Sequence, residues 1–475
     1  MNRHSFHRNC FLRVLLFSVF CFLFSGIGFA SPALMPDVTA EMSNPYYWAA
    51  MQQSDANAIL ANETVIHQLN NQLLFDSNTN MYDLLHMNGY VNTIELSQSI
   101  TASLSKDAHS YCNGKYFDRS GNPLNESSFA PLIVNATDPR ATASAPLQYA
   151  VAVNRTIMLA FPGDLLITDQ RGDVDFDYNV LSAIRVNEPL VIKLFSSDHQ
   201  YAYVYASHCQ GWVPTKDIAV CHNYNEWIDA WNIPSDQVLV ITDGKVFLNE
   251  SNFNSSVSNR MLTMGTILRI APKDSYGALI NNRAAYQNYV VYLPARNADG
   301  SYRKELALIP QNQDVHEGYV PLTTANILRI AFNMLGDNYG WGGMLSSEDC
   351  SGYLRAVYKC FGLELARNTS WQSASPLFHY DVSSFDDTQK MEILNNMPAG
   401  SILFFRGHEM MYLGQQNGKY YVLSACSSMA NIQGPGIMRT RGIFINTLDV
   451  KRANGTTWLR NIHTMQVPYY PAQNP

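Results

Sequence analysis

The stretch that decides the fold of this chain reads Asp349-Cys350-Ser351-Gly352-Tyr353. It places a cysteine where a helix should begin, because apolar residues follow it at helical spacing. The unpaired amides and the dipole of a helix N-terminus stabilise a thiolate, and the same amides can hold an oxyanion during acyl transfer. A buried structural cysteine is the common alternative. Cys350 is therefore a candidate nucleophile.

Further along the chain, His408 follows Gly407 at the head of an apolar strand. A cysteine hydrolase needs a general base within hydrogen-bond reach of its thiol, and histidine is the usual one. Spacing alone leaves a satisfied core histidine as the alternative, because only the fold can bring residues 350 and 408 together. The pair predicts a cysteine hydrolase.

Residues 323–475 follow an α+β pattern around these two groups. Thr323 or Thr324 can cap one helix, and a second helix begins at Cys350 or Ser351. Gly336 and Gly362 are the expected stops of these helices. Strands are expected at 401–405, 408–413, 420–425 and 438–445, as apolar runs bounded by turn residues.

Composition excludes several classes of protein. The chain has 475 residues, of which 47% are hydrophobic and 15% charged, so several domains can each bury a core. The formal net charge is −7, whereas a nucleic-acid binder usually carries a basic surface. We therefore expect no nucleic-acid partner, and we expect a monomer.

The first 30 residues have the pattern of a signal peptide. Arginines at positions 3, 8 and 13 precede an apolar run at 14–24, and Gly28-Phe29-Ala30 has the small-x-small form of a cleavage site. An uncleaved anchor is the alternative, although the run is short for a membrane span. The pattern predicts a periplasmic or extracellular protein that has no stable membrane insertion after cleavage.

Six cysteines remain after that cleavage, too few for a disulfide scaffold in a chain of this size. Cys209 and Cys221 are close enough in sequence to bridge, and this possibility stays open. Their neighbours His208 and His222 suggest zinc, but adjacent residues on a strand point to opposite faces, so the four side chains would not converge. We expect no metal and no cofactor.

The mature chain divides into further regions before residue 323. Residues 31–130 are Asn-rich with a helical pattern, which includes Ile59, Leu69 and Leu73, and predict a helical clip or cap. Two sets of short aromatic-rich strands follow, at 131–232 and 233–322. Their last strands should be Gly211-Trp212-Val213 and Gly318-Tyr319-Val320, which resemble the end of bacterial SH3-like barrels.

Four motifs of the C-terminal region together resemble the NlpC family of cell-wall cysteine peptidases. The motifs occupy residues 339–343 (Tyr-Gly-Trp-Gly-Gly), 349–353, 367–372 (Arg-Asn-Thr-Ser-Trp-Gln) and 407–414 (Gly-His-Glu-Met-Met-Tyr-Leu-Gly). The helical segment and paired barrels resemble the multidomain members of this family. The resemblance implies a multidomain fold: a helical N-terminal segment, two all-β SH3-like barrels and an α+β papain-like peptidase domain.

The resemblance also implies a reaction and a set of site residues. Such enzymes hydrolyse peptidoglycan stem peptides, and members with SH3-like domains cut between D-glutamate and the diamino acid when L-alanine has a free amino group. Tyr339 would help to form the oxyanion hole, and Ser370 would line the pocket. Asp349 and Ser351 would hold the substrate's ammonium group, although Asp349 also suits a helix N-cap.

One position departs from the family pattern. The family places a histidine that orients the base on the strand after His408, and Ser424 stands at that position. Serine can accept a hydrogen bond from imidazole but carries no charge. With a two-residue turn at Asn417-Gly418, Ser424 would face away from His408, whereas a bulge would reverse that.

The sequence therefore predicts an exported cysteine endopeptidase in which Cys350, His408, Ser424 and Tyr339 are catalytic. A catalytically weak or inactive wall-binding protein that acts through its SH3-like domains is the second hypothesis. An acyltransferase or amidase on the same core is the third, and its products would differ from those of γ-glutamyl cleavage.

Overall fold

The computed structural model describes residues 33–87 and 89–471, so the predicted signal peptide lies outside it. Within these ranges, no helix is both long enough and apolar enough to cross a membrane. No disulfide forms among the described cysteines, and Cys209 and Cys221 are free thiols.

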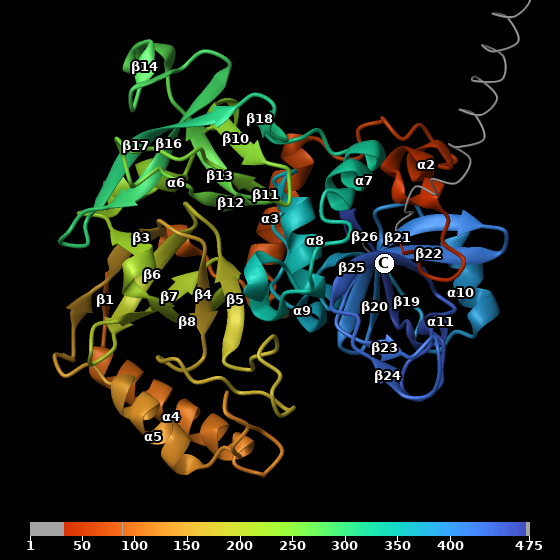
Figure 1. Cartoon of the computed structure of the whole chain (residues 1–475), viewed down its shortest axis with the longest axis horizontal. Coiled ribbons are helices and arrows are strands. Elements are labelled where there is room, and N and C mark those ends of the chain that lie inside the picture. The colour runs from red at the N-terminus through yellow and green to blue at the C-terminus, as the bar shows by residue number, and fades with distance from the viewer. Residues whose placement is uncertain (1–32, 88, 472–475) are drawn as a thin grey trace, which may run out of the picture.

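The N-terminal segment is helical, and its helices serve two different parts of the molecule. They are α2 (Pro45–Ala50), α3 (Glu63–Phe75), α4 (Thr93–Tyr111) and α5 (Glu126–Asn135). Figure 1 shows α2 beside α7 (Thr324–Phe332), whereas the α4–α5 hairpin lies far away, at the end of the first barrel. Trp48 of α2 is fully buried, 5.2 Å from the ring of Tyr421. The predicted helical position of Ile59 is wrong, because Ile59 precedes α3 and is 59% exposed.

The first barrel is an antiparallel sheet with the strand order β5-β4-β8-β7-β6-β3-β9. Alternate residues of β7, namely Ala202, Val204 and Ala206, point into its core, as the period of a half-buried strand requires. The strands are β3 (Gln148–Ala152), β4 (Thr156–Leu159), β5 (Val180–Ile184), β6 (Pro189–Phe195), β7 (Tyr201–Ala206), β8 (Cys209–Pro214) and β9 (Ile218–Val220), and α6 (Tyr224–Trp231) follows.

The second barrel contains a sheet of strand order β17-β16-β13-β10-β18. These are β10 (Val238–Ile241), β13 (Ile267–Ile270), β16 (Asn288–Arg296), β17 (Tyr302–Pro310) and β18 (Val315–Glu317). The strand predicted at 318–320 is wrong, because β18 ends at Glu317. Gly318 has φ +72°, and the chain then turns toward the C-terminal domain, where the Val320 amide donates to the Cys360 carbonyl at 3.0 Å.

Short two-stranded antiparallel sheets lie outside these larger sheets. They are β1 (Tyr90–Val91) with β2 (Ala145–Pro146), β11 (Lys245–Phe247) with β12 (Met261–Thr263), β14 (Leu279–Ile280) with β15 (Arg283–Ala284), and β23 (Met429–Ala430) with β24 (Ile437–Met438).

The C-terminal domain has the predicted α+β form, with helices packed on an antiparallel sheet of order β19-β26-β20-β21-β22-β25. Its strands are β19 (Leu377–Asp381), β20 (Ile402–Phe405), β21 (His408–Gln416), β22 (Lys419–Cys426), β25 (Gly442–Thr447) and β26 (Thr464–Pro471). Besides α7, its helices are α8 (Cys350–Lys359), α9 (Thr369–Ser373), α10 (Asp387–Leu394) and α11 (Trp458–Asn461).

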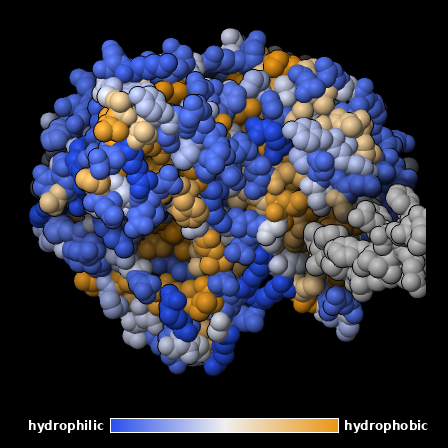
Figure 2. Space-filling model, turned by 45° about the horizontal axis from the view of Figure 1, so that its top comes forward, coloured by the Kyte–Doolittle hydropathy of each residue, from blue (hydrophilic) through white to orange (hydrophobic). Residues whose placement is uncertain are grey.

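Helix α8 lies at the centre of the molecule. Figure 1 shows it between the barrels and the C-terminal sheet, and every one of its residues is buried. A helix that buries Arg355 and Lys359 needs partners for both charges, so its surroundings must supply carboxylates or other acceptors. The outer face in Figure 2 is mainly hydrophilic, with apolar side chains gathered in small separate groups.

Candidate active site

Cys350 is the first residue of α8, and Asp349 is the N-cap of that helix. Asp349 Oδ1 accepts the backbone amide of Gly352 at 2.8 Å, so the N-cap alternative is what the structure shows. The cap leaves the thiol at the positive end of the helix dipole, where the amide of Cys350 has no partner within its own helix.

Arg367 holds Asp349 in a two-pronged ion pair. Its Nη2 lies 2.7 Å from Asp349 Oδ2 and its Nη1 lies 3.1 Å from Oδ1, while the Gly342 amide also donates to Oδ2 at 3.0 Å. Burial opposes the charge on Asp349, but Arg367 outweighs it, so the pKa of this carboxyl falls below its ordinary value. The positive charge of Arg367 therefore already compensates the negative charge that Asp349 carries when ionised.

Ser351 belongs to the same arrangement. Its Oγ donates to Asp349 Oδ1 at 3.2 Å and accepts from Arg367 Nη1 at 3.1 Å. The structure thus brings the two predicted ammonium-binding residues together, but it satisfies both with Arg367. The sequence motif contains Arg367, and no spacing rule pairs it with Asp349.

Residues of the first barrel form hydrogen bonds with Arg367 and with Arg355 of α8. Arg367 Nε donates to Ser182 Oγ at 2.8 Å, and Ser182 also contacts His208 Nε2 at 3.1 Å. Arg355 Nη2 donates to His208 Nδ1 at 2.8 Å, so Nδ1 is the acceptor and Nε2 carries the proton. Burial, followed by the charge of Arg355, lowers the pKa of His208 well below its ordinary value. The neutral His208 is therefore a structural link between the domains.

A second ionic contact joins the same two domains. Arg185, the residue that follows β5, donates from Nη2 to Glu348 Oε1 at 2.9 Å, and both side chains are buried. Arg155 Nη2 donates to the Ser347 carbonyl at 2.8 Å. The residues immediately before the nucleophile are therefore anchored to the first barrel.

The thiol of Cys350 is buried, and its surroundings favour the protonated form. Burial, then the negative charges of Asp349 and Glu409, raise the pKa of Cys350 above its ordinary value, and Thr369 and the Glu409 amide lower it in part. Thr369 Oγ1 lies 3.6 Å from Sγ.

Tyr339 lies in the same neighbourhood. Burial, followed by the charges of Cys350 and Asp349, raises the pKa of Tyr339 well above its ordinary value. Its hydroxyl therefore keeps its proton and remains a hydrogen-bond donor, which is the property that an oxyanion hole requires.

His408 begins β21, and its ring packs against two aromatic side chains. The ring centroid lies 5.2 Å from that of Phe405 and 5.1 Å from that of Trp458. Burial, then the charge of Arg452, lowers the pKa of His408 to about 3. In the described part of the chain no hydrogen bond joins His408 to Cys350, and Nε2 has no partner.

The strand register resolves which way Ser424 points. Gln416 pairs with Lys419 across a two-residue turn, and the register then shifts between Tyr412 and Gly414, so that Met411 faces Leu423. This is the bulge alternative: extending the register sets Ser424 opposite Met410, on the same face as His408. Ser424 Oγ is nevertheless buried without a hydrogen-bond partner in the described structure.

Ser370 lies in α9 and is exposed, with its Oγ donating to Asn368 at 2.9 Å. The preceding residue, Thr369, is the one that reaches the thiol. The sequence did not point to Thr369, Ser182 or Glu409 as residues of the site. It also did not point to Arg367 as the partner of Asp349. Position in the motif could have suggested Thr369, whereas Ser182 lies in another domain and leaves no local signal.

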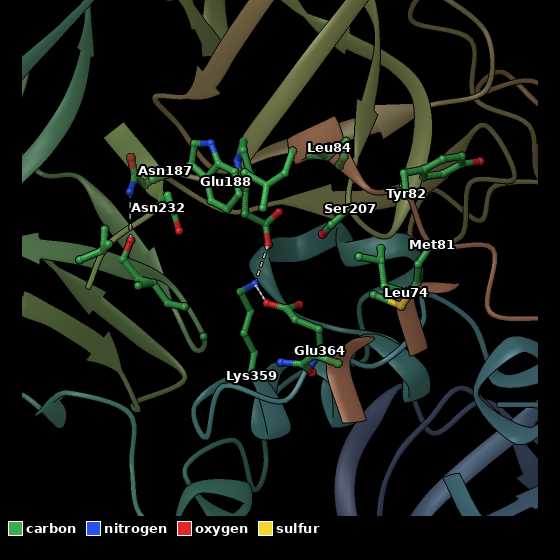
Figure 3. A pocket seen from close by; sticks show the side chains of 18 of the residues that line it. Leu74, Met81, Tyr82, Leu84, Asn187, Glu188, Ser207, Asn232, Lys359 and Glu364 are labelled. Atoms are coloured by element: carbon green, nitrogen blue, oxygen red, sulfur yellow. Dashed lines mark hydrogen bonds and ion pairs between the residues drawn. The ribbon is translucent and has the colours of Figure 1, made fainter. Parts of the chain in front are cut away.

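The far end of α8 borders a cavity of about 260 Å³ between the domains. Figure 3 shows Lys359 between Glu188 of the first barrel and Glu364, and it contacts both. The walls come from the helical segment, both barrels and α8, and include Leu74, Met81 and Ile267. The buried charge on α8 is thus satisfied by the barrel, as its burial requires.

Comparisons with known proteins agree with this architecture. Residues 336–433 match the NlpC/P60 family, and residues 168–214 match an SH3 domain of the SH3b1 type. Among solved structures, a novel NlpC/P60 endopeptidase from Photobacterium damselae subsp. piscicida has 17% sequence identity and a TM-score of 0.70, and the match covers 93% of this chain and 100% of that chain.

An NlpC/P60 family protein from Bacillus cereus ATCC 10987 has 15% identity and a TM-score of 0.43, with 62% of this chain and 83% of that chain covered. A search of curated proteins found no match.

The fold and the Cys350 region define a multidomain protein with a papain-like C-terminal domain. That domain contains the residues that match the NlpC/P60 family, and the first barrel contains the residues that match the SH3b1-type domain.

Proposed function

We propose that this protein is a cysteine endopeptidase that hydrolyses the stem peptides of peptidoglycan. The observation that carries the proposal is the position of Cys350 at the start of α8, N-capped by an Asp349 that Arg367 holds ionised. This is the geometry in which first-turn amides can stabilise an oxyanion on a substrate carbonyl. The NlpC/P60 match of the same residues supports it.

In the proposed reaction, Cys350 Sγ attacks the peptide carbonyl. His408, whose ring packs against Phe405 and Trp458 in the described structure, must turn toward the thiol to take its proton. Burial raises the pKa of the Cys350 thiol and lowers the pKa of the His408 imidazole, and both shifts favour the neutral forms. Proton transfer then accompanies attack instead of preceding it. The Cys350 amide and the Tyr339 hydroxyl would hold the oxyanion, and His408 would return the proton to the leaving amine.

The bond that we propose is the one between γ-D-glutamate and the diamino acid, in peptides with a free N-terminal L-alanine. Its support is the resemblance to family members that carry SH3-like domains. We further propose that residues 1–30 direct export, so that the enzyme acts in the periplasm or outside the cell as a monomer. No nucleic acid and no cofactor enter this account.

A second candidate function is wall binding without turnover. Two observations favour it: Ser424 replaces the orienting histidine of the family, and no hydrogen bond links His408 to Cys350 in the described structure. The SH3-like domains would then supply the binding.

Mass spectrometry of digested peptidoglycan tests the proposal. The mature protein should release fragments that end in γ-D-glutamate, and a variant without the thiol, Cys350→Ala, should release none. Cys112→Ala is the matched control, because it removes a thiol in another domain. Intact muropeptides that bind the protein would support the second function, and products cut at another bond would support an amidase or acyltransferase.

A further inference from the structure

A broad groove lies at the opposite end of β21 from His408. Its volume is about 1020 Å³, and its walls come from residues 51–54, β19, α10 and the ends of β21 and β26. Strand β21 begins with His408 and reaches the groove at Gly414 and Gln415. The stretch from residue 408 to residue 414 spans about 20 Å of extended strand, so the groove and the candidate active site are separate.

Aromatic side chains form part of the groove wall. Phe378 and Tyr380 of β19 both line it, with their ring centroids 5.1 Å apart. Phe385 lies just before α10, and Tyr470 is near the end of β26. Tyr380 and Tyr470 are 41% and 42% exposed. Exposed rings in an open groove indicate a binding surface, because a ligand that covers them buries a large apolar area.

The polar part of the wall consists mainly of amide side chains. They belong to Gln52, Gln53, Gln389, Asn395, Asn396 and Gln415. Each amide carries both hydrogen-bond donors and an acceptor, and those of Gln389, Asn395 and Gln415 belong to exposed residues. Glu392 is the one charged residue among the described residues that line the groove.

The charge of the groove decides between classes of ligand. With no cation among its described lining residues, it offers no partner to a phosphate polymer or a nucleic acid. A stem peptide is also a poor match, because its carboxylates would meet Glu392. The matching ligand is uncharged, with polar groups for the amides and apolar faces for the rings. A chain of N-acetylated sugars has these properties, since the CH groups of a pyranose ring pack on aromatic rings.

We propose that this groove binds the glycan strand of peptidoglycan, an inference that rests on the proposed function. The strand keeps the enzyme on the wall while Cys350 acts on peptides at the separate active site. Loss of the groove should therefore slow the cleavage of intact peptidoglycan and leave the cleavage of a free tripeptide unchanged.

Calorimetric titration of the mature Cys350→Ala protein with oligomers of N-acetylglucosamine tests the binding without turnover. Tyr380→Ala and Tyr470→Ala each remove an exposed ring, so both variants should fold. We expect each to weaken oligomer binding by about 3- to 10-fold. Tyr286→Ala, which removes a 73% exposed ring between β15 and β16, is the matched control and should bind as the parent protein does.

Several outcomes would overturn the proposal. The parent protein could fail to bind the oligomers, or all the variants could bind them with equal affinity, which would place the sugar elsewhere. Tighter binding of an uncharged proline-rich peptide than of the oligomers would assign the groove to a protein partner. If a tyrosine variant does not fold, Gln415→Ala probes the same groove at an exposed amide, and unchanged affinity in that variant would contradict the proposal.

Activity measurements separate this inference from the proposed function. With the thiol present, the double variant Tyr380→Ala and Tyr470→Ala should cleave the free tripeptide at the wild-type rate and intact peptidoglycan more slowly. Oligomer binding without any cleavage by the wild-type protein would support the groove and reject the endopeptidase. Cleavage without oligomer binding would do the reverse.

Discussion

Ser182 in the first barrel accepts a hydrogen bond at 2.8 Å from Arg367, 185 residues away in the sequence. Arg367 in turn neutralises Asp349, the N-cap of the helix that begins with Cys350. The first barrel therefore contributes to the position of the nucleophile, and the peptidase domain depends on it for a satisfied polar interior.

Replacing Arg367 should destabilise the protein strongly. Arg367→Met leaves Asp349 as an uncompensated buried charge, and we expect a loss of about 3 kcal/mol or more in the free energy of unfolding. Ser182→Ala removes the acceptor shared by Arg367 Nε and His208 Nε2 and should cost about 1–2 kcal/mol. Urea unfolding of the three proteins gives both values. A loss for Arg367→Met no larger than that for Ser182→Ala would contradict the importance of this ion pair.

The free energy of unfolding should depend on pH because of the buried His408 ring. Its pKa is about 3 in the folded state against an ordinary 6.5, so the unfolded chain binds a proton first as the pH falls. Stability should then decrease between about pH 6.5 and pH 3, by at most about 1.4 kcal/mol per pH unit from this group. His408→Gln should flatten that slope relative to wild type, and His67→Gln, at an exposed site, is the control. An unchanged slope in His408→Gln would show that the ring is not held neutral.

Tyr339→Phe should slow the reaction without harming the fold. The variant keeps the buried ring and loses the hydroxyl that we assign to the oxyanion hole. We expect kcat to fall by about 10²-fold, with a similar KM and melting temperature. A normal kcat in this variant would move the second oxyanion donor to another group.

Ser424→Ala should have little effect on activity. Because Ser424 Oγ has no hydrogen-bond partner in the described structure, its removal should leave kcat/KM within about twofold and stability equal or slightly higher. Ser424→His restores the residue found in the family pattern and, on the same face as His408, should raise kcat. A large loss in Ser424→Ala would instead show that the serine orients the base during the reaction.

The sequence predicts well those features that depend on neighbouring residues. Asp349 before Cys350 is a cap signal that fixes the start of α8, and the aromatic strands indicate the barrels. It does not predict the direction of Ser424, because the bulge between Tyr412 and Gly414 arises where β21 packs in the sheet. The sequence also does not predict the contact of Ser182 with Arg367, because no local pattern marks two polar residues that meet across a domain boundary.

Cleavage of the tripeptide L-Ala-γ-D-Glu-diamino acid, followed by chromatography at equal concentrations of folded protein, tests the central claim most directly. The account predicts that the mature wild-type protein releases the diamino acid and that Cys350→Ala does so about 10³-fold more slowly or not at all. Equal rates for the two proteins, or no cleavage by wild type of any γ-glutamyl wall peptide, would contradict it.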